Sequence, residues 1–386
     1  MKKIIIILLT VFISALSNDV YALYGSGEDG GVFMRVVQSP RAAAMGDSGV
    51  AIGGDILASV SLNPATLSSL RYKEIGFVYT SWFENIAMQQ LAYAHPFDKN
   101  GVLATSISML QIKSFDGYDN FGTPMGDVES SDMVISMLYS RRLFGPWNDL
   151  RNGLFMGAGV KYAKEKLDTV SANTTLFDLG ALWVLPAGGG RFSIGASASS
   201  LPNSNGFKFD TEQDPAPTIY RGGIGYTTTL FGDPLALAFD LRKPSDDDTG
   251  YSFGIEYILK NIVAFRFGFL NENDMTDKGI GKLRFGAGFN LKLIKIDYAL
   301  ASYGDFDLTH RISVSMKFGS PIDVTPHLTP QEEKSMWHIE KAKEYMGQNR
   351  YYDAIVELNE ALKLDPKNND ALRLMEKSKD MIDTIR

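Results

Sequence analysis

Apolar and polar residues alternate with a period of two along most of the chain, from about residue 73 to residue 318. In GKLRFGAGFN, residues 281–290, leucine, alanine and two phenylalanines share one face, while the charged residues and most of the glycines share the other. HRISVSMKF, residues 310–318, sets isoleucine, valine, methionine and phenylalanine against arginine, lysine and serines. Because side chains point alternately to the two faces of a β-strand, this pattern predicts two-faced strands.

The alternation predicts fourteen antiparallel strands, and most are longer than the about 5 or 6 residues that are usual in soluble sandwiches. Their lengths suit the about 9 to 11 residues that a tilted strand needs to cross a bilayer. The connections after odd-numbered strands reach about 18 residues, whereas those after even-numbered strands are mostly shorter, as in outer-membrane barrels. The strands are expected at about 73–82, 86–97, 101–112, 131–143, 153–164, 173–186, 190–200, 217–228, 234–243, 250–258, 263–270, 281–290, 293–301 and 308–318.

A closed barrel in a membrane explains both faces of these strands. Lipid requires every backbone N–H and C=O group to be paired within the protein, and a barrel without edges meets this requirement. The apolar faces then point to lipid and the polar faces to the lumen. The alternation alone leaves open a soluble barrel with the faces reversed, but fourteen strands are too many for a small soluble barrel with a filled core. We therefore predict an all-β transmembrane barrel over residues 71–318, in contact with the bilayer of a bacterial outer membrane.

The residues before the barrel predict export and a plug. Residues 1–22 have the pattern of a secretory signal peptide, with two lysines, an apolar run and the cleavage region Val20-Tyr21-Ala22. An even number of strands brings both ends of the barrel to one side, which should be the periplasm. Residues 23–70 are therefore expected to form an N-terminal plug beneath or inside the lumen.

Composition excludes several other classes of function. The chain has no cysteine, which excludes disulfides and thiolate metal sites. Its formal net charge is −7 and it contains no block of like charge, so the sequence offers no basic surface for nucleic acid. The four histidines are scattered, so no metal site or cofactor is expected, and an enzyme is the least favoured class.

Charged residues of both signs occur on the polar faces of consecutive strands in the second half of the barrel. They have two interpretations: a polar conduit, or cross-strand ion pairs that hold the wall and a plug together. The second interpretation is favoured. The lumen charges are Asp240, Arg242, Glu256, Arg266, Arg284, Asp297 and Arg311.

A different kind of sequence follows the last strand. Residues 319–330 contain three prolines and are expected to form a linker, which ends in the capping box Thr329-Pro330-Gln331-Glu332. Residues 331–386 show helical spacing and predict a small α-helical domain in the periplasm. This domain resembles one tetratricopeptide repeat with a capping helix, although Asn349 stands where glycine is usual. The matching residues, which form a packing core or a face for a partner, are Ala342, Tyr345, Tyr351, Ala354, Leu358, Ala361 and Pro366.

A single such repeat needs a neighbour, since about three are usually required for independent stability. We therefore expect this domain to pack on the barrel or on a periplasmic protein partner.

The stretch SPRAAAMGDSGVAIGGDILASVSLNPATLSSL, residues 39–70, is rich in alanine and glycine. It is not a phosphate-binding P-loop, because GDSGVAIGGD lacks the lysine and hydroxyl of that motif and follows no strand of a βαβ unit. Close packing of a plug against the barrel wall explains its small residues better. Arg41 is expected to pair with a lumen carboxylate such as Asp240 or Glu256, and Asn63-Pro64 to set the turn into the first strand. The candidate gate residues are Arg41, Gly46, Asn63 and Pro64.

This stretch, with KEIGFVYTSWFENIAMQQLAYAHPF shortly after it, resembles the start of PorV/PorQ-family outer-membrane proteins, relatives of the long-chain fatty-acid transporter FadL. The resemblance rests on RAAAMG at residues 41–46, on Gly49, and on Asn63-Pro64-Ala65 just before the first strand. It spans residues 31–318 and implies a fourteen-stranded barrel with an N-terminal plug.

The resemblance implies two kinds of function. FadL-like members carry hydrophobic ligands through the lumen to a lateral gap in the wall, whereas PorV-like members take part in type IX secretion by handling exported proteins. The expected function is uptake of a hydrophobic small molecule, such as a fatty acid, without catalysis. The alternative is a secretion or envelope-assembly protein whose tetratricopeptide-like domain docks a periplasmic partner; the repeat is a departure from a plain transporter.

Overall fold

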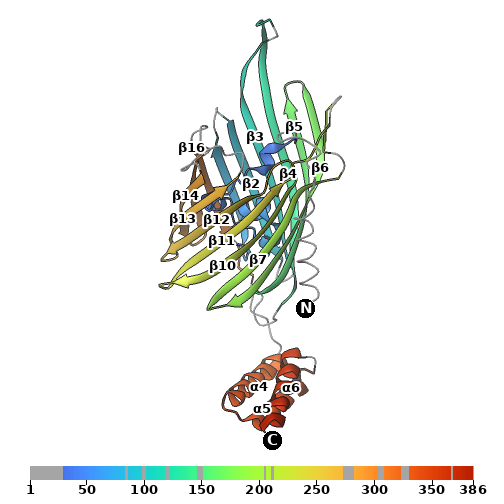
Figure 1. The fold of residues 1–386 in the computed structure, drawn as a ribbon, viewed down its shortest axis with the longest axis vertical. Helices are drawn as coiled ribbons and strands as arrows, with labels where there is room; N and C mark the ends of the chain where they lie inside the picture. Colours follow the sequence, from blue (N-terminus) through green and yellow to red (C-terminus); the bar gives the residue numbers. More distant parts are fainter. Residues whose placement is uncertain are drawn as a thin grey trace. The chain divides into compact units, whose positions relative to one another are not determined.

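The structure is a computed structural model of the 386-residue chain, drawn as a ribbon in Figure 1. It describes residues 29–82, 86–97, 101–118, 121–145, 151–203, 206–209, 213–272, 282–302, 308–322, 330–366 and 368–385. The predicted signal peptide and residues 323–329 of the predicted linker lie outside the described residues. The chain divides into two compact units, Met1–Val324 and Thr325–Arg386.

In the first unit, fourteen strands of the described residues close into one antiparallel barrel. β1 pairs with β16 to complete the ring, with Lys73 opposite Phe318. The predicted fold class is therefore confirmed. The barrel strands are β1 (Lys73–Ser81), β2 (Ile86–Phe97), β3 (Gly101–Tyr118), β4 (Pro124–Phe144), β5 (Gly153–Leu167), β6 (Val170–Ala187), β7 (Gly190–Pro202), β10 (Ile219–Leu230), β11 (Asp233–Pro244), β12 (Gly250–Leu259), β13 (Val263–Asn271), β14 (Leu283–Leu291), β15 (Ile294–Ser302) and β16 (Leu308–Phe318).

Four strands are longer than the alternation predicts by three residues or more. β3 and β4 replace most of the long connection expected after residue 112, and β5 and β6 replace most of the one expected after residue 164. Within the described residues, β3 and β4 pair only with each other beyond Ile112 and Ser130. Figure 1 shows this two-stranded ribbon projecting past the other strands. Most of its side chains are exposed on both faces, so they need not alternate, and the pattern could not predict it.

The two ends of the barrel differ in their connections. The turn end carries the short connections 188–189, 231–232 and 292–293, together with the start of β1 and the end of β16. The loop end carries the connection 245–249 and the segment between β7 and β10. That segment contains a small separate sheet of β8 (Phe207–Lys208) and β9 (Gln213–Asp214).

The outer face of the barrel is apolar and exposed, whereas the inner face is buried. In β16, Ile312, Val314 and Met316 are each 45% exposed or more, while Arg311 on the inner face is 0% exposed. Tyr139 also lies on the exposed outer face, close to the turn end of β4. An outer face of this composition is suited to contact with lipid rather than with water.

The segment before β1 runs through the barrel from the loop end to the turn end. Gly31 N donates to Glu165 Oε2 at the loop end of β5 (3.0 Å), and Ile322 N donates to Arg71 O at the turn end (2.7 Å). Residues 29–72 are named the plug below, and residues 29–37 are its strap. The plug contains η1 (Val32–Arg35), α2 (Pro40–Ala44), α3 (Ile56–Leu62) and η2 (Pro64–Ser69).

The second unit is a bundle of three helices. Its buried core draws on all of them, with Ile339 from α4, Leu358 from α5 and Met375 from α6. Pro330 stands at the first helical position, as the capping-box pattern predicts, although Thr329 lies outside the described residues. Among the described residues, no helix is both long and apolar enough to cross a membrane. The helices are α4 (Pro330–Gly347), α5 (Tyr351–Leu364) and α6 (Asn369–Ile385).

Candidate functional site

Glycines on the inner face of the barrel let the plug lie directly against the wall. A Cβ atom on Gly268 of β13 would lie 2.1 Å from Gly46 N, and one on Gly157 of β5 would lie 2.5 Å from Ala65 N. Backbone atoms cannot move aside easily, so at these positions only glycine allows the plug to approach so closely. Further inner-face glycines in contact with the plug are Gly180, Gly195, Gly225, Gly254 and Gly286.

The candidate gate residue Gly46 lies where α2 turns toward the wall. Its φ is 74°, in the left-handed region that favours glycine. A Cβ atom at this position would also lie 2.5 Å from Phe269 O of β13. Both the backbone conformation and the close contact therefore require glycine here.

Asn63 and Pro64 attach a later part of the plug to the barrel wall at β6. Asn63 is 0% exposed, and its Nδ2 donates to Val50 O (2.7 Å) and to Ala181 O of β6 (3.0 Å). Its Oδ1 accepts from Ala65 N (3.0 Å), which caps η2, and Pro64 is the first residue of that helix. The pair thus begins a helix as well as preceding the first strand, and it bonds the plug to β6.

Arg41, the fourth candidate gate residue, pairs with the wall. Its Nη2 donates to Glu256 Oε1 (2.7 Å), and its Nε donates to Glu256 Oε2 (2.9 Å). Its Nη1 donates to Gly53 O within the plug (2.9 Å). Glu256 also accepts from Nε of Arg266 (2.6 Å), so one carboxylate of β12 joins a plug arginine to a wall arginine. Of the two carboxylates expected beside Arg41, the structure places Glu256 there.

The ion pairs continue across the wall to β15. Arg266 Nη1 lies 2.8 Å from Asp297 Oδ1, and Lys295 Nζ lies 2.9 Å from Asp297 Oδ2. The side chains of Arg41, Glu256 and these three residues are each 16% exposed or less. Removing one member of such a buried set leaves its partner with an uncompensated charge. We name these five residues the charge network.

Asp55 extends the electrostatic contacts of the plug. It caps α3, since its Oδ1 accepts from Leu57 N (3.1 Å), and its Oδ2 accepts from Ser39 Oγ (2.6 Å). Lys295 and Arg41 act on this carboxyl through space, so Asp55 holds the start of α3 beside the charge network.

The other predicted lumen charges lie apart from the charge network. Asp240 Oδ2 accepts from Gly49 N (2.7 Å) and Val50 N (2.8 Å), so it binds the backbone of the plug. Arg242 pairs with Glu272. Arg284 and Arg311 are at most 1% exposed on the inner faces of β14 and β16, and the Arg311 guanidinium lies 5.4 Å from the centre of the Trp82 ring.

The inner face is not polar throughout, which corrects the expectation from the alternation. Near the loop end, Met88, Val134 and Leu176 point inward and are each 4% exposed or less. They contact the plug and loop residues instead of water, so apolar side chains are stable on this face as well as on the lipid face. We name the whole set the loop-end cluster: Phe33, Met88, Val134, Ala163, Ala172, Leu176, Phe207 and Ala216.

The strap enters this cluster through Phe33 and is fastened by polar contacts on either side of it. Arg35 pairs with Asp29 and with Asp246 of the loop end, and Ser245 Oγ donates to Asp29 Oδ2 (2.8 Å). Burial raises the pKa of Asp29, an effect that Asp246 adds to and that Ser245 and Arg35 oppose. The sequence pattern did not predict the strap. The apolar run Val32-Phe33-Met34, which follows a glycine pair, was the feature that could have indicated a buried segment there.

In the helical unit, the residues that match the tetratricopeptide pattern form the core. Ala342, Ala354, Leu358 and Ala361 are all 0% exposed. Asn349 has a φ of 59°, in the left-handed region that favours glycine and that asparagine tolerates. The remaining matches are Tyr345, which packs on the core, Tyr351, which is buried, and Pro366, which follows the end of α5.

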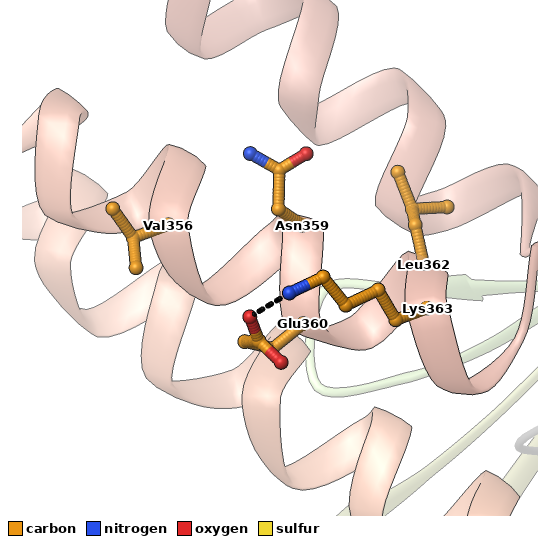
Figure 2. A pocket seen from close by; sticks show the side chains of 5 residues that line it. All are labelled: Val356, Asn359, Glu360, Leu362 and Lys363. Carbon is orange, nitrogen blue, oxygen red and sulfur yellow. Dashed lines mark hydrogen bonds and ion pairs between the residues drawn. The ribbon is translucent and has the colours of Figure 1, made fainter.

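A shallow recess lies on the outer side of α5, as Figure 2 shows. Val356, Asn359 and Leu362 line it, and Lys363 forms an ion pair with Glu360 across one side (2.5 Å). Val356 is 60% exposed, and the neighbouring Tyr352 is 64% exposed. Within the described residues, no group of three or more histidine, aspartate or glutamate side chains is placed to hold a metal ion.

Comparisons with known proteins agree with the barrel architecture. No protein-family model matches the chain, and no curated protein matches it. Among solved structures, the TodX monoaromatic hydrocarbon channel, as a deltaS2 mutant, is similar with a TM-score of 0.50 and 13% identity, over 73% of this chain and 100% of that one. The CymD monoaromatic hydrocarbon channel gives 0.48 and 13%, over 73% and 97%. A Pseudomonas aeruginosa FadL homologue gives 0.43 and 9%, over 73% and 98%. The chain therefore has a closed fourteen-stranded β-barrel fold similar to that of the TodX channel.

Proposed function

We propose that this protein takes up small hydrophobic molecules across the bacterial outer membrane, through a barrel that its own plug closes. The loop end faces outward in this proposal, and the turn end faces the periplasm together with the helical unit. The proposal is supported by the FadL-like fold and by one observation in particular. Near the loop end, the inward-facing wall is apolar, and the side chain that occupies it, Phe33, belongs to the plug.

An apolar inner surface distinguishes this barrel from a channel for polar solutes. A water-filled channel has a polar interior, whereas sites for hydrophobic ligands are mostly apolar, with a few polar groups that orient the ligand. The loop-end cluster supplies the first element, and charged side chains deeper in the lumen supply the second. TodX and CymD are channels for monoaromatic hydrocarbons, which fits the same class of solute.

Transport requires the plug to move, because its residues fill the lumen against the wall. The gate in this proposal comprises Arg41, Gly46, Asn63 and Pro64, which fasten the plug to β12, β13 and β6. In this proposal the charge network holds the plug in its closed position. When Arg41 leaves Glu256, that carboxylate stays paired with Arg266. The negative charge of Glu256 is therefore still compensated within the wall after the plug shifts.

The proposal is tested on the purified full-length protein. We expect mass spectrometry of co-extracted lipid to show hydrophobic molecules enriched over those found with an unrelated outer-membrane barrel purified in the same detergent. Liposomes that contain the protein should also take up a labelled fatty acid faster than liposomes with the unrelated barrel. Absence of both effects contradicts the proposal.

A second candidate function is secretion or envelope assembly of the PorV/PorQ kind, in which the helical unit docks a periplasmic protein. The exposed Tyr352 and Val356 beside the recess on α5 favour it, because exposed apolar side chains that lie together often mark contact sites. Deleting residues 325–386 separates the two candidates. Uptake that survives the deletion while protein export fails supports secretion; the reverse outcome supports uptake.

A further inference from the structure

Three tight turns at the turn end of the barrel carry large side chains in a backbone conformation that favours glycine. Phe231, Lys260 and Lys292 have φ values of 53°, 50° and 51°, in the left-handed region that glycine and asparagine adopt most easily. Phe231 is 93% exposed, so packing inside the barrel does not explain it, and both lysines are exposed as well. Backbone strain of this kind is retained where the side chain has a function.

These turns lie next to one another and form a continuous rim. Lys260 N donates to Oδ1 of Asp233, which directly follows the turn 231–232 (2.8 Å). Asn290 N donates to Ile262 O (2.7 Å), which connects the turn after β12 to the strand that leads into the turn after β14. Lys260 and Lys292 each begin their turn, so they lie two strand spacings, or about 10 Å, apart. Their long side chains can therefore reach one anionic group between them.

The rim is basic, whereas the opposite end of the barrel carries acidic connections. Asp233 is the acidic residue of the three turns, and its carboxylate already accepts from Lys260 N and from Tyr257 OH (3.0 Å). In the described part of the chain, neither Lys260 nor Lys292 forms an ion pair. At the loop end, the connection 245–249 contains three consecutive aspartates, residues 246–248. An anionic molecule is therefore attracted to the turn end.

Apolar side chains accompany the two lysines. Ile262, Leu291 and Leu293 are 47%, 54% and 50% exposed. They continue the outer face of the barrel, where Phe289 of β14 is 51% exposed. The lipid-facing surface thus extends into the rim, and the cations stand at its edge. Lysines at the edge of an apolar surface are suited to the depth at which phospholipid headgroups lie.

We propose that this rim binds the headgroups of anionic phospholipids in the periplasmic leaflet, with Lys260 and Lys292 on the phosphate and the apolar turn residues among the acyl chains. Lysine binds phosphate as a point charge, and basic side chains near a membrane surface attract its anionic lipids. A soluble acidic protein would also meet the cations, but it would leave the apolar surface beside them uncovered. The inference goes beyond the proposed uptake function and uses only its placement of the turn end toward the periplasm.

The test measures lipid binding to the purified full-length protein by native mass spectrometry. The probes are phosphatidylglycerol and phosphatidylcholine with the same acyl chains, so that they differ in the charge of the headgroup. The wild-type protein should bind phosphatidylglycerol about tenfold more tightly, as expected for two lysines near one anionic headgroup. Lys260→Asn combined with Lys292→Asn should remove most of this preference. Lys113→Gln combined with Lys164→Gln removes the same charge from exposed positions near the loop end and should keep it.

Urea unfolding in lipid vesicles separates a binding role from a structural one. Because asparagine tolerates the left-handed region better than lysine does, Lys260→Asn with Lys292→Asn should unfold at the same urea concentration as the wild-type protein or at a higher one. Phe231→Asn should likewise not lower stability, and it should weaken both lipids equally because it removes apolar surface without changing charge.

Three results overturn the inference. The first is equal wild-type affinity for the two lipids, and the second is an equal loss of preference in the loop-end control. The third is a preference that survives Lys260→Asn with Lys292→Asn, which would favour an acidic protein as the partner of the two lysines. A double variant that loses the preference and also unfolds at a lower urea concentration assigns the lysines a structural role and overturns it as well.

Discussion

Glu256 accepts hydrogen bonds from two arginines at once, Arg41 of the plug and Arg266 of the wall. The alternation of polar and apolar residues placed Glu256 on the inner face, and its charge made it one of two expected partners for Arg41. The choice between Glu256 and Asp240 depends on how far the plug descends into the barrel, which no sequence pattern specifies. Asp240 instead meets the backbone of Gly49, a contact that involves no distinctive side chain.

We predict that Arg41→Ala destabilises the folded protein by about 3 to 5 kcal/mol, the usual cost of breaking a buried ion pair. Urea unfolding in lipid vesicles measures the loss. Lys166→Ala is the control, because Lys166 faces Glu129 at 3.8 Å in an exposed pair that contributes about 0 to 1 kcal/mol. Liposome permeability should rise in Arg41→Ala. Unchanged permeability with lower stability would make Arg41 a structural residue and not part of a gate.

Two glycines on the same face of β5 give a matched test of how closely the plug packs. A Cβ atom on Gly157 would meet the backbone of Pro64 and Ala65, whereas one on Gly159 would meet chiefly the flexible side chain of Leu138. Gly157→Ala should therefore cost about 1 to 3 kcal/mol or more and loosen the plug, while Gly159→Ala should cost less. Urea unfolding and protease digestion of the plug check the order. Equal effects contradict the close packing described for β5.

Among the elements, the strands were the most predictable part and the strap the least. Strands β10 to β16 begin and end close to the predicted residues, because lipid on one face and a polar lumen on the other impose the period of two. The ribbon of β3 and β4 meets neither environment, so its sequence carries no such period. The strap precedes the alanine- and glycine-rich stretch at residues 39–70. Its Phe33 belongs to one cluster with residues that are remote in sequence, such as Leu176.

We predict that lowering the pH tightens the strap. Burial raises the pKa of Asp29 in the docked strap, so the docked state binds this proton more tightly than the released state does. Protonation as the pH falls therefore favours docking, and ionisation as the pH rises through the raised pKa weakens it. A nitroxide on Val32→Cys reports strap mobility without interference, since the natural chain has no cysteine.

The spin-label spectrum should broaden as the pH falls, and in Asp29→Asn it should change less with pH than in the wild-type protein. Asp246 and Glu165 also contact the strap and keep their carboxylates in Asp29→Asn, whereas the serine hydroxyl of Ser245 and the new amide do not titrate in this range. A spectrum that changes with pH to the same extent in Asp29→Asn would assign the effect to another group.

At the scale of the whole molecule, the sequence predicted a barrel, a plug and a separate helical unit, but not which side chains of the plug meet which strands. Strand number and the outer face follow from local alternation, which one sequence displays. The buried charge network and the loop-end cluster depend on contacts between the plug and distant strands, as between Arg41 and Glu256. Glycines repeated on the polar face, such as Gly254 and Gly268, were the visible sign that something packs against the wall.

The core of three helices leads us to expect that the helical unit folds alone with low stability, although the sequence pattern predicted that it needs a neighbour. Its core joins three helices, yet so small a unit rarely gains more than about 3 to 5 kcal/mol from one apolar core. Expressed as residues 325–386, it should give a helical circular dichroism spectrum and unfold at low urea concentration. Leu358→Ala, at a fully buried position, should cost about 2 to 5 kcal/mol and unfold it, whereas Val356→Ala, on the exposed side of the same helix, should change stability by about 0.5 kcal/mol or less. An unfolded wild-type segment would contradict independent folding and indicate that the repeat needs a neighbour to complete its core.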